Sequence, residues 1–132
     1  CDAETSEVSP NEDIEAVILP GGMPGTLNLE KSEKVNEFID RASSDGKLIC
    51  AICAAPSVLG HKNLLRGKTA TCFPGFEKDL YGAVATGALV ERDGNIITAR
   101  GMGVALEFGL KTVEALCGSE VAESIKTSVQ SE

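Results

Sequence analysis

Lys47-Leu48-Ile49-Cys50-Ala51-Ile52-Cys53-Ala54-Ala55-Pro56-Ser57-Val58-Leu59-Gly60 is the stretch that decides the fold of this chain. Its first half is a short apolar run, which predicts a strand buried on both faces. Its second half predicts the start of a helix, because proline is well tolerated in a first helical turn. Cys53 therefore lies where a strand turns into a helix, beside free backbone N–H groups that favour a thiolate. A cysteine at this place is a candidate nucleophile or redox sensor.

Two other interpretations of these cysteines stay open. Free cysteines are among the most buried residues, and this is the state expected for Cys50 inside the strand. Cys50 and Cys53 also form a C-x-x-C spacing, which is typical of redox or metal pairs. However, residues three apart in a strand point to opposite faces, so the two sulfurs are not expected to meet. The sequence has no second C-x-x-C and one histidine, so no metal site is expected.

The composition limits the class of protein. The 132 residues are expected to form one domain, whose core is built from aliphatic side chains because the chain has four Phe, one Tyr and no Trp. A net charge of −8 argues against nucleic acid and anionic membranes as partners. Five cysteines, an odd number, do not form a disulfide framework, which favours a reducing cytoplasm. No run approaches the roughly 18 apolar residues of a membrane span.

Strand and helix signals alternate along the chain. Strands are predicted at 14–19, 47–52, 68–72 and 84–86, with a hairpin of 88–92 and 95–99 around Asp93-Gly94. Helices are predicted from Ser32, as the cap, to about Ser44, from Pro56 to Gly67, from 104 to 117 and from Ser119 onward. The helix at 104–117 is expected to face the core with Ala105, Phe108, Gly109, Thr112, Val113 and Leu116. His61 is expected at the surface or half-buried.

This alternation predicts an α/β fold with a mostly parallel sheet covered on both faces. In such sheets ligands bind beyond the carboxyl ends of the strands. Three turns, Gly21-Gly22, Cys53-Ala54 and Phe73-Pro74, are expected at those ends. Their convergence on one edge favours a functional role for Cys53.

Three motifs carry a family resemblance. Residues 17–22 (VILPGG), 51–56 (AICAAP) and 99–103 (ARGMG), the last followed by Glu107-Phe108, closely resemble the ThiJ/PfpI superfamily, which includes the parkinsonism-associated protein deglycase. The resemblance covers the whole chain and implies a flavodoxin-like three-layer sandwich, a homodimer and Cys53 as the reactive cysteine. It also implies an oxyanion-type pocket lined by the N–H groups of Gly22 and Ala54, near Gly21, Phe73 and Pro74. No cofactor is implied.

The sequence departs from the family pattern in two ways. The family's opening strand-helix unit, which carries the glutamate that hydrogen-bonds the reactive cysteine, has no counterpart in residues 1–132. We therefore expect a single domain that is an N-terminally truncated fragment, or one whose missing unit comes from another chain or segment. Phe73 also stands where some members have a histidine, and His61 is on the wrong element to replace it. A Cys–His dyad is thus unsupported.

The function that follows from the resemblance is a cysteine-dependent reaction with small reactive carbonyls, of the glyoxalase or deglycase type. In it the Cys53 thiolate attacks an aldehyde and a carboxylate moves the proton. One alternative is a non-enzymatic oxidative-stress sensor or holdase chaperone that uses oxidation of Cys53. Intracellular protease or amidase activity and a catalytically silent domain are further alternatives.

Overall fold

The computed structural model describes residues 2–131. Its strands are β1 (Ala16–Leu19), β2 (Leu48–Ile52), β3 (Thr69–Ala70), β4 (Val84–Ala85), β5 (Val90–Asp93) and β6 (Ile96–Ala99). Its α-helices are α1 (Gly25–Lys31), α2 (Glu33–Ser44), α3 (Pro56–His61), α4 (Ala105–Cys117) and α5 (Ser119–Ser128). Two short 3-10 helices complete the list, η1 (Glu77–Asp79) and η2 (Met102–Val104).

Four strands form the main sheet, in the order β1-β2-β6-β5. β1, β2 and β6 run parallel, and Cys50 lies between Ile18 of β1 and Ile97 of β6. β5 is antiparallel to β6, which confirms the hairpin predicted around Asp93-Gly94. β3 and β4 form a separate parallel pair. The main sheet is therefore mostly parallel, as predicted.

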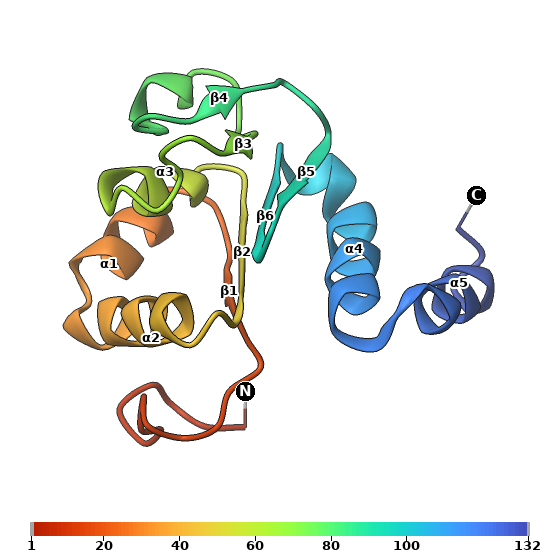
Figure 1. Cartoon of the computed structure of the whole chain (residues 1–132), viewed down its shortest axis with the longest axis horizontal. Coiled ribbons are helices and arrows are strands. Elements are labelled where there is room, and N and C mark those ends of the chain that lie inside the picture. Colours follow the sequence, from red (N-terminus) through yellow and green to blue (C-terminus); the bar gives the residue numbers. More distant parts are fainter. Residues whose placement is uncertain (1, 132) are drawn as a thin grey trace.

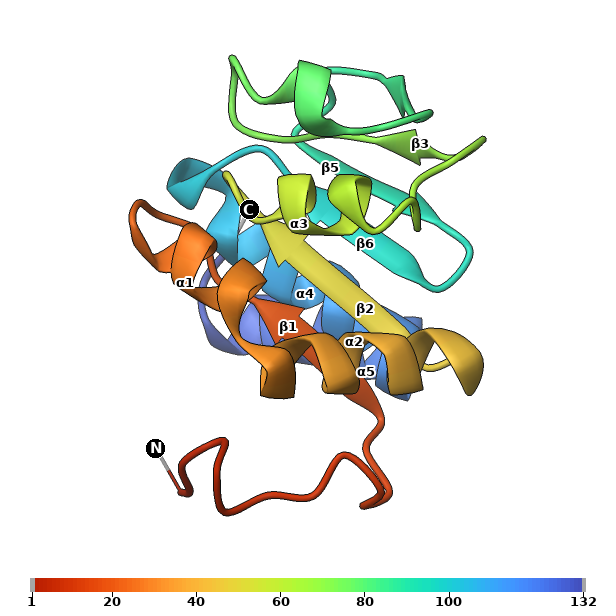
Figure 2. The ribbon, with the colours of Figure 1, turned by 90° about the vertical axis from the view of Figure 1, so that its left-hand side faces the viewer.

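Helices cover both faces of this sheet. Figure 1 shows α1, α2 and α3 on one side of the strands, with α4 and α5 on the other. In Figure 2 the first group lies in front of the sheet and α4 lies behind it. α2 packs against β1 and β2, α4 packs against β2 and β6, and α5 packs against α4. This is the three-layer, flavodoxin-like α/β arrangement that the sequence predicted.

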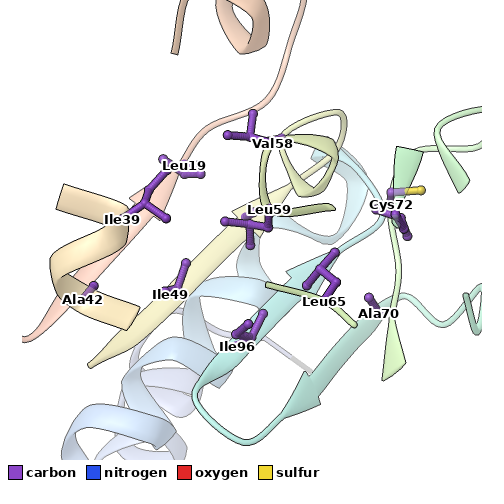
Figure 3. Close-up of a cluster of buried hydrophobic side chains, with 13 residues drawn as sticks. Leu19, Ile39, Ala42, Ile49, Val58, Leu59, Leu65, Ala70, Cys72 and Ile96 are labelled. Atoms are coloured by element: carbon purple, nitrogen blue, oxygen red, sulfur yellow. The ribbon is translucent and has the colours of Figure 1, made fainter. Parts of the chain in front are cut away.

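The central strand β2 is buried on both faces because its side chains alternate between the two layers. Ile49 and Ala51 belong to the larger core cluster, together with the fully buried Ile39 of α2 (Figure 3). Leu48 and Cys50 belong to a second cluster on the α4 side. One apolar strand thus supplies both halves of the core, which confirms the reading of its continuous apolar run.

The start of α2 follows the predicted capping. The Ser32 hydroxyl accepts a hydrogen bond from the Val35 N–H at 3.3 Å, so the helix begins at Glu33. Ile39 and Ala42 point from α2 into the core, and both are fully buried.

The helices differ from the predictions in three places. α1 was not predicted, because seven residues give too short a window for an apolar period. α3 ends at His61 rather than at Gly67, since Asn63 adopts a left-handed conformation with φ of 59°. In α4 the predicted stripe is only partly buried.

Phe108 and Thr112 of α4 are buried, whereas Ala105, Gly109 and Leu116 are exposed. Within residues 2–131, α5 and the short η2 pack against α4 beside its contact with the sheet. β1 likewise pairs with β2 alone in the described part, and Ile18 is 52% exposed. The expectation of a further strand-helix unit stays a prediction. No helix in residues 2–131 combines the length and apolarity needed to cross a membrane.

Candidate functional site

The structure brings the three predicted turns together at the carboxyl edge of the sheet. Gly21 follows β1 and Cys53 follows β2, and the two parallel strands end side by side. The N–H of Phe73 donates to the carbonyl of Cys53 at 2.8 Å, which fixes the third turn to the second. The candidate site is therefore built from loops held by the core of the sheet.

Cys53 occupies the junction between β2 and α3 in an unusual conformation. Its φ of 66° lies in the left-handed region, which costs a residue with a side chain about 1–2 kcal/mol. The Cys53 N–H donates to the Ala99 carbonyl at 2.9 Å, so the ladder between β2 and β6 continues into the junction. A strained backbone conformation of this kind persists only where the surrounding structure enforces it, and such conformations cluster at functional sites. It is also the geometry of a nucleophile elbow.

Gly21 lies directly against Cys53. A Cβ on Gly21 would stand 2.5 Å from the Cys53 Cβ, 2.6 Å from the Ile52 carbonyl oxygen and 3.3 Å from the Cys53 Sγ. Only a glycine leaves room for the cysteine at this point. The sequence predicted this glycine turn, but not that its backbone forms one wall of the thiol site.

Thr26 of α1 fixes the conformation of the turn that follows. Its buried hydroxyl donates to the Gly22 carbonyl at 2.9 Å, and its N–H donates to the same oxygen at 2.9 Å. Gly22 has a φ of 88° and accepts both bonds without a steric penalty. Sequence reasoning missed Thr26, because its partner is defined only once α1 is known to form.

Two backbone N–H groups remain available beside the thiol. No acceptor in residues 2–131 receives a hydrogen bond from the N–H of Gly22 or Ala54. The Ala54 carbonyl is held by the buried Ser57 hydroxyl at 2.7 Å, which fixes the orientation of the first turn of α3. Free, oriented N–H groups can stabilise a negative oxygen that forms at a nearby carbon.

An apolar hollow adjoins the third turn. Its volume is about 300 Å³, and its lining is almost entirely apolar. It is lined by Phe73, Pro74, Leu89, Arg100, Gly101, Met102, Gly103 and Val104. Phe73 lies against Gly101, where a Cβ would stand 3.4 Å from its ring. The site therefore offers an apolar surface beside Phe73 and Pro74, the two residues predicted to border it.

The remaining described thiols are in settings that differ from Cys53. Cys50 is fully buried, accepts a weak hydrogen bond from the Thr112 hydroxyl at 3.6 Å, and has its pKa raised by burial. Burial, with a smaller contribution from Glu77, raises the pKa of Cys72 to about 11. Cys117 is exposed at the end of α4. The four described cysteines are free thiols. Cys1 lies outside the described residues.

His61 is half-buried, as expected, and takes no part in the thiol site. Its Nδ1 contacts Glu30 Oε1 and its Nε2 lies 3.5 Å from Asp79 Oδ1. Within the described part of the chain, no side chain forms a hydrogen bond with the Cys53 Sγ, and no cluster of three or more His, Cys, Asp or Glu is arranged to hold a metal ion.

Comparison with known proteins places the chain in a family. The sequence pattern of the DJ-1/PfpI family matches residues 1–115. The chain is 39% identical to Protein DJ-1alpha of Drosophila melanogaster over 127 residues, covering 94% of this chain and 58% of that protein. It is 40% identical to Protein DJ-1 homolog B of Arabidopsis thaliana over 114 residues, covering 85% of this chain and 26% of that protein. The solved structure of Toxoplasma gondii DJ-1, oxidized, superposes with a TM-score of 0.92 at 33% identity, covering 98% of this chain and 71% of that one.

Proposed function

Since the chain belongs to the DJ-1/PfpI family, we propose that it is a cysteine-dependent stress-response protein that acts on small reactive carbonyls through Cys53. The observation that carries the proposal is the position of Cys53, whose left-handed backbone places it between the glycine turn after β1 and the first turn of α3. Gly22 lies in the turn between β1 and α1, and Ala54 lies in the junction between β2 and α3.

The chemistry proposed for this site starts with addition to an aldehyde such as methylglyoxal. The Cys53 thiolate forms a C–S bond with the aldehyde carbon, and the electron pair of the C=O bond moves to the oxygen. The N–H groups of Gly22 and Ala54 donate to this oxyanion, which is then protonated to give a hemithioacetal.

A proton must then move from the former aldehyde carbon to the adjacent carbonyl carbon. This shift converts the hemithioacetal into a thioester without any external oxidant, and water releases lactate and the thiol. In the proposal a carboxylate transfers this proton. The apolar hollow beside Phe73 and Pro74 supports a substrate with a short apolar group, such as the methyl of methylglyoxal.

A second candidate is a non-enzymatic oxidative-stress sensor or holdase chaperone. The solved structure of the Toxoplasma gondii relative is of an oxidized form. In this chain, Cys53 is partly exposed whereas Cys50 and Cys72 are buried. A partly exposed thiol beside free N–H groups can be oxidised to a sulfinate that those groups stabilise.

The test is methylglyoxal turnover by the full-length protein and by its Cys53→Ser and Cys117→Ser variants. Cys53→Ser is expected to fall to the rate of the uncatalysed reaction, because a serine hydroxyl is a much weaker nucleophile without an adjacent base. Cys117→Ser is the matched control and is expected to retain the parent rate, since Cys117 is exposed on α4.

Equal turnover by Cys53→Ser and the parent would refute the enzymatic proposal. Peroxide treatment followed by peptide mass mapping then examines the second candidate. Selective formation of sulfinate at Cys53, together with a change in the suppression of client aggregation, would support it.

A further inference from the structure

We propose that His61 is a positioning residue that holds together the three elements leading out of the turns around Cys53. α1 follows the Gly21-Gly22 turn, α3 follows Cys53, and η1 follows the Phe73-Pro74 turn. His61 is the last residue of α3 and contacts a carboxylate on each of the other two elements. The expected effect of a His61 substitution on turnover rests on the proposed function. Its expected effect on the conformation of the turns does not.

The contacts define a compact group, the His61 cluster, made of His61, Glu30 and Asp79. Nδ1 contacts Glu30 Oε1 from α1, and Nε2 lies 3.5 Å from Asp79 Oδ1 from η1. An ionised carboxylate only accepts hydrogen bonds, so both ring nitrogens can donate at once only when the imidazole is protonated. The neutral ring keeps one bond and loses the other. The cluster is therefore complete only with a charged His61.

The backbone around the cluster is packed closely enough to transmit its geometry. A Cβ on Gly60, the residue before His61, would stand 2.0 Å from the Asp79 carbonyl oxygen. η1 therefore rests directly on α3. At the other end, the Glu30 carbonyl accepts from the Asn36 side-chain amide at 2.7 Å, which ties the end of α1 to α2.

The charged groups that face the imidazole come from each neighbouring element. Glu30 faces it from α1 and Asp79 from η1, and the Tyr81 ring lies 5.0 Å from the imidazole centroid. Lys62, the next residue, points instead to α2, where it pairs with Asp40 at 2.8 Å. Within the described residues, the charged groups paired with His61 are thus two carboxylates, and the Tyr81 ring packs beside it.

The pH dependence follows in sign from these neighbours. The hydrogen bond to Glu30 is the largest of the effects that raise the pKa of His61 above its ordinary value. A raised pKa in the folded state means that the cluster is fully formed below about pH 6.5, the ordinary histidine value. The stabilisation is lost as the pH rises through the folded-state pKa.

Loosening the cluster is expected to shift the turns relative to Cys53 rather than to change the thiol itself, which His61 does not contact. A displacement of about 1 Å at an oxyanion donor can cost up to roughly 10² in rate. We therefore expect the ratio of kcat/KM between the parent and His61→Gln to lie between roughly 3 and 10² below pH 6.5. The ratio should approach 1 as the pH rises past the folded-state pKa.

The experiment compares the full-length protein with its His61→Gln and Glu30→Gln variants. Glu37→Gln is the matched control, because Glu37 is an exposed carboxylate of α2 outside the cluster. The NMR signal of the His61 imidazole is assigned by its absence from the spectrum of His61→Gln. Its chemical shift is then measured as a function of pH. We expect its midpoint to lie above 6.5 in the parent and in the control, and to be lower in Glu30→Gln. Methylglyoxal kcat/KM is measured over the same pH range.

Amide hydrogen exchange tests the role of His61 independently of whether the proposed function is correct. The amide of Phe73 bonds to the Cys53 carbonyl, so its hydrogen-exchange rate reports directly on how firmly the third turn is held. Below the imidazole midpoint it should exchange at least about threefold faster in His61→Gln than in the parent, and above the midpoint equally fast.

If Cys53→Ser is as active as the parent, the proposed function is wrong. The hydrogen-exchange data still test whether His61 positions the turns. An imidazole midpoint at or below the ordinary value would overturn the positioning role. So would an exchange ratio between the parent and His61→Gln that stays the same on both sides of the midpoint.

Discussion

Replacing Gly21 with alanine tests how the sheet edge holds the reactive cysteine. The new Cβ would lie 2.5 Å from the Cys53 Cβ and 2.6 Å from the Ile52 carbonyl oxygen. Neither atom is the end of a flexible side chain, so the clash can be relieved only by moving the junction after β2. Overpacking of this kind costs about 1–3 kcal/mol. For a domain of this size we expect the melting temperature to fall by roughly 3–15 °C.

The same movement is expected to displace Cys53 relative to the Gly21-Gly22 turn. At a temperature well below the melting transition, the rate of methylglyoxal turnover by Gly21→Ala should therefore fall by more than the fraction of folded protein falls. Gly25→Ala is the matched control. No atom lies within 4 Å of a Cβ at Gly25, and such a substitution is expected to be neutral or to stabilise by about 0.4–1 kcal/mol.

Thermal and urea unfolding of the two variants, together with iodoacetamide labelling of Cys53, check this prediction. The reasoning is wrong if Gly21→Ala unfolds at the same temperature and urea concentration as Gly25→Ala, with an unchanged labelling rate. That result would mean that the glycine turn and the cysteine move apart without cost, and that the close contact does not position the thiol.

Three further predictions concern other parts of the site and the fold. At pH 8 a thiol with a pKa of about 11 is ionised to roughly 10⁻³, so iodoacetamide should label the exposed Cys117 within the time in which Cys72 stays unmodified, as peptide mass mapping can show. Thr26→Val removes the hydroxyl bond to the Gly22 carbonyl and should cost about 0.5–1.5 kcal/mol in urea unfolding, whereas Thr26→Ser should retain most of the stability. Ser32→Ala removes the cap of α2 and should cost about 0.5–2 kcal/mol by the same assay; no measurable change would show that the hydroxyl bond is not formed in solution.

The sequence predicted those parts of the fold that depend on local patterns. The continuous apolar run at β2, the Ser32 cap and the Asp93-Gly94 turn each determine a structure within a few residues, and all three are confirmed. α1 could not be predicted in this way, because seven residues do not establish a helical period. The early end of α3 depends on the left-handed conformation of Asn63, which a periodic apolar pattern does not reveal.

The candidate site was predictable at the level of turns but not at the level of contacts. Parallel strands bring their carboxyl ends to one edge, so the residues after β1 and β2 were expected to meet. The close contact of Gly21 with Cys53 depends on the left-handed backbone of the cysteine, which has no simple sequence signature. The roles of these residues in catalysis stay predictions.

The His61 cluster shows most clearly why burial and spacing alone are insufficient. The sequence predicted correctly that His61 is at most half-buried, yet its partners are 31 and 18 residues away along the chain. They meet because α1, α3 and η1 each follow one of the three turns around Cys53. In our proposal, a histidine that lies between two carboxylates, on elements that follow the three turns around Cys53, links the protonation of one half-buried side chain to the geometry of a thiol that it does not touch. For this reason the pH dependence of turnover should contain a component from the His61 imidazole, and substitution of His61 should remove that component.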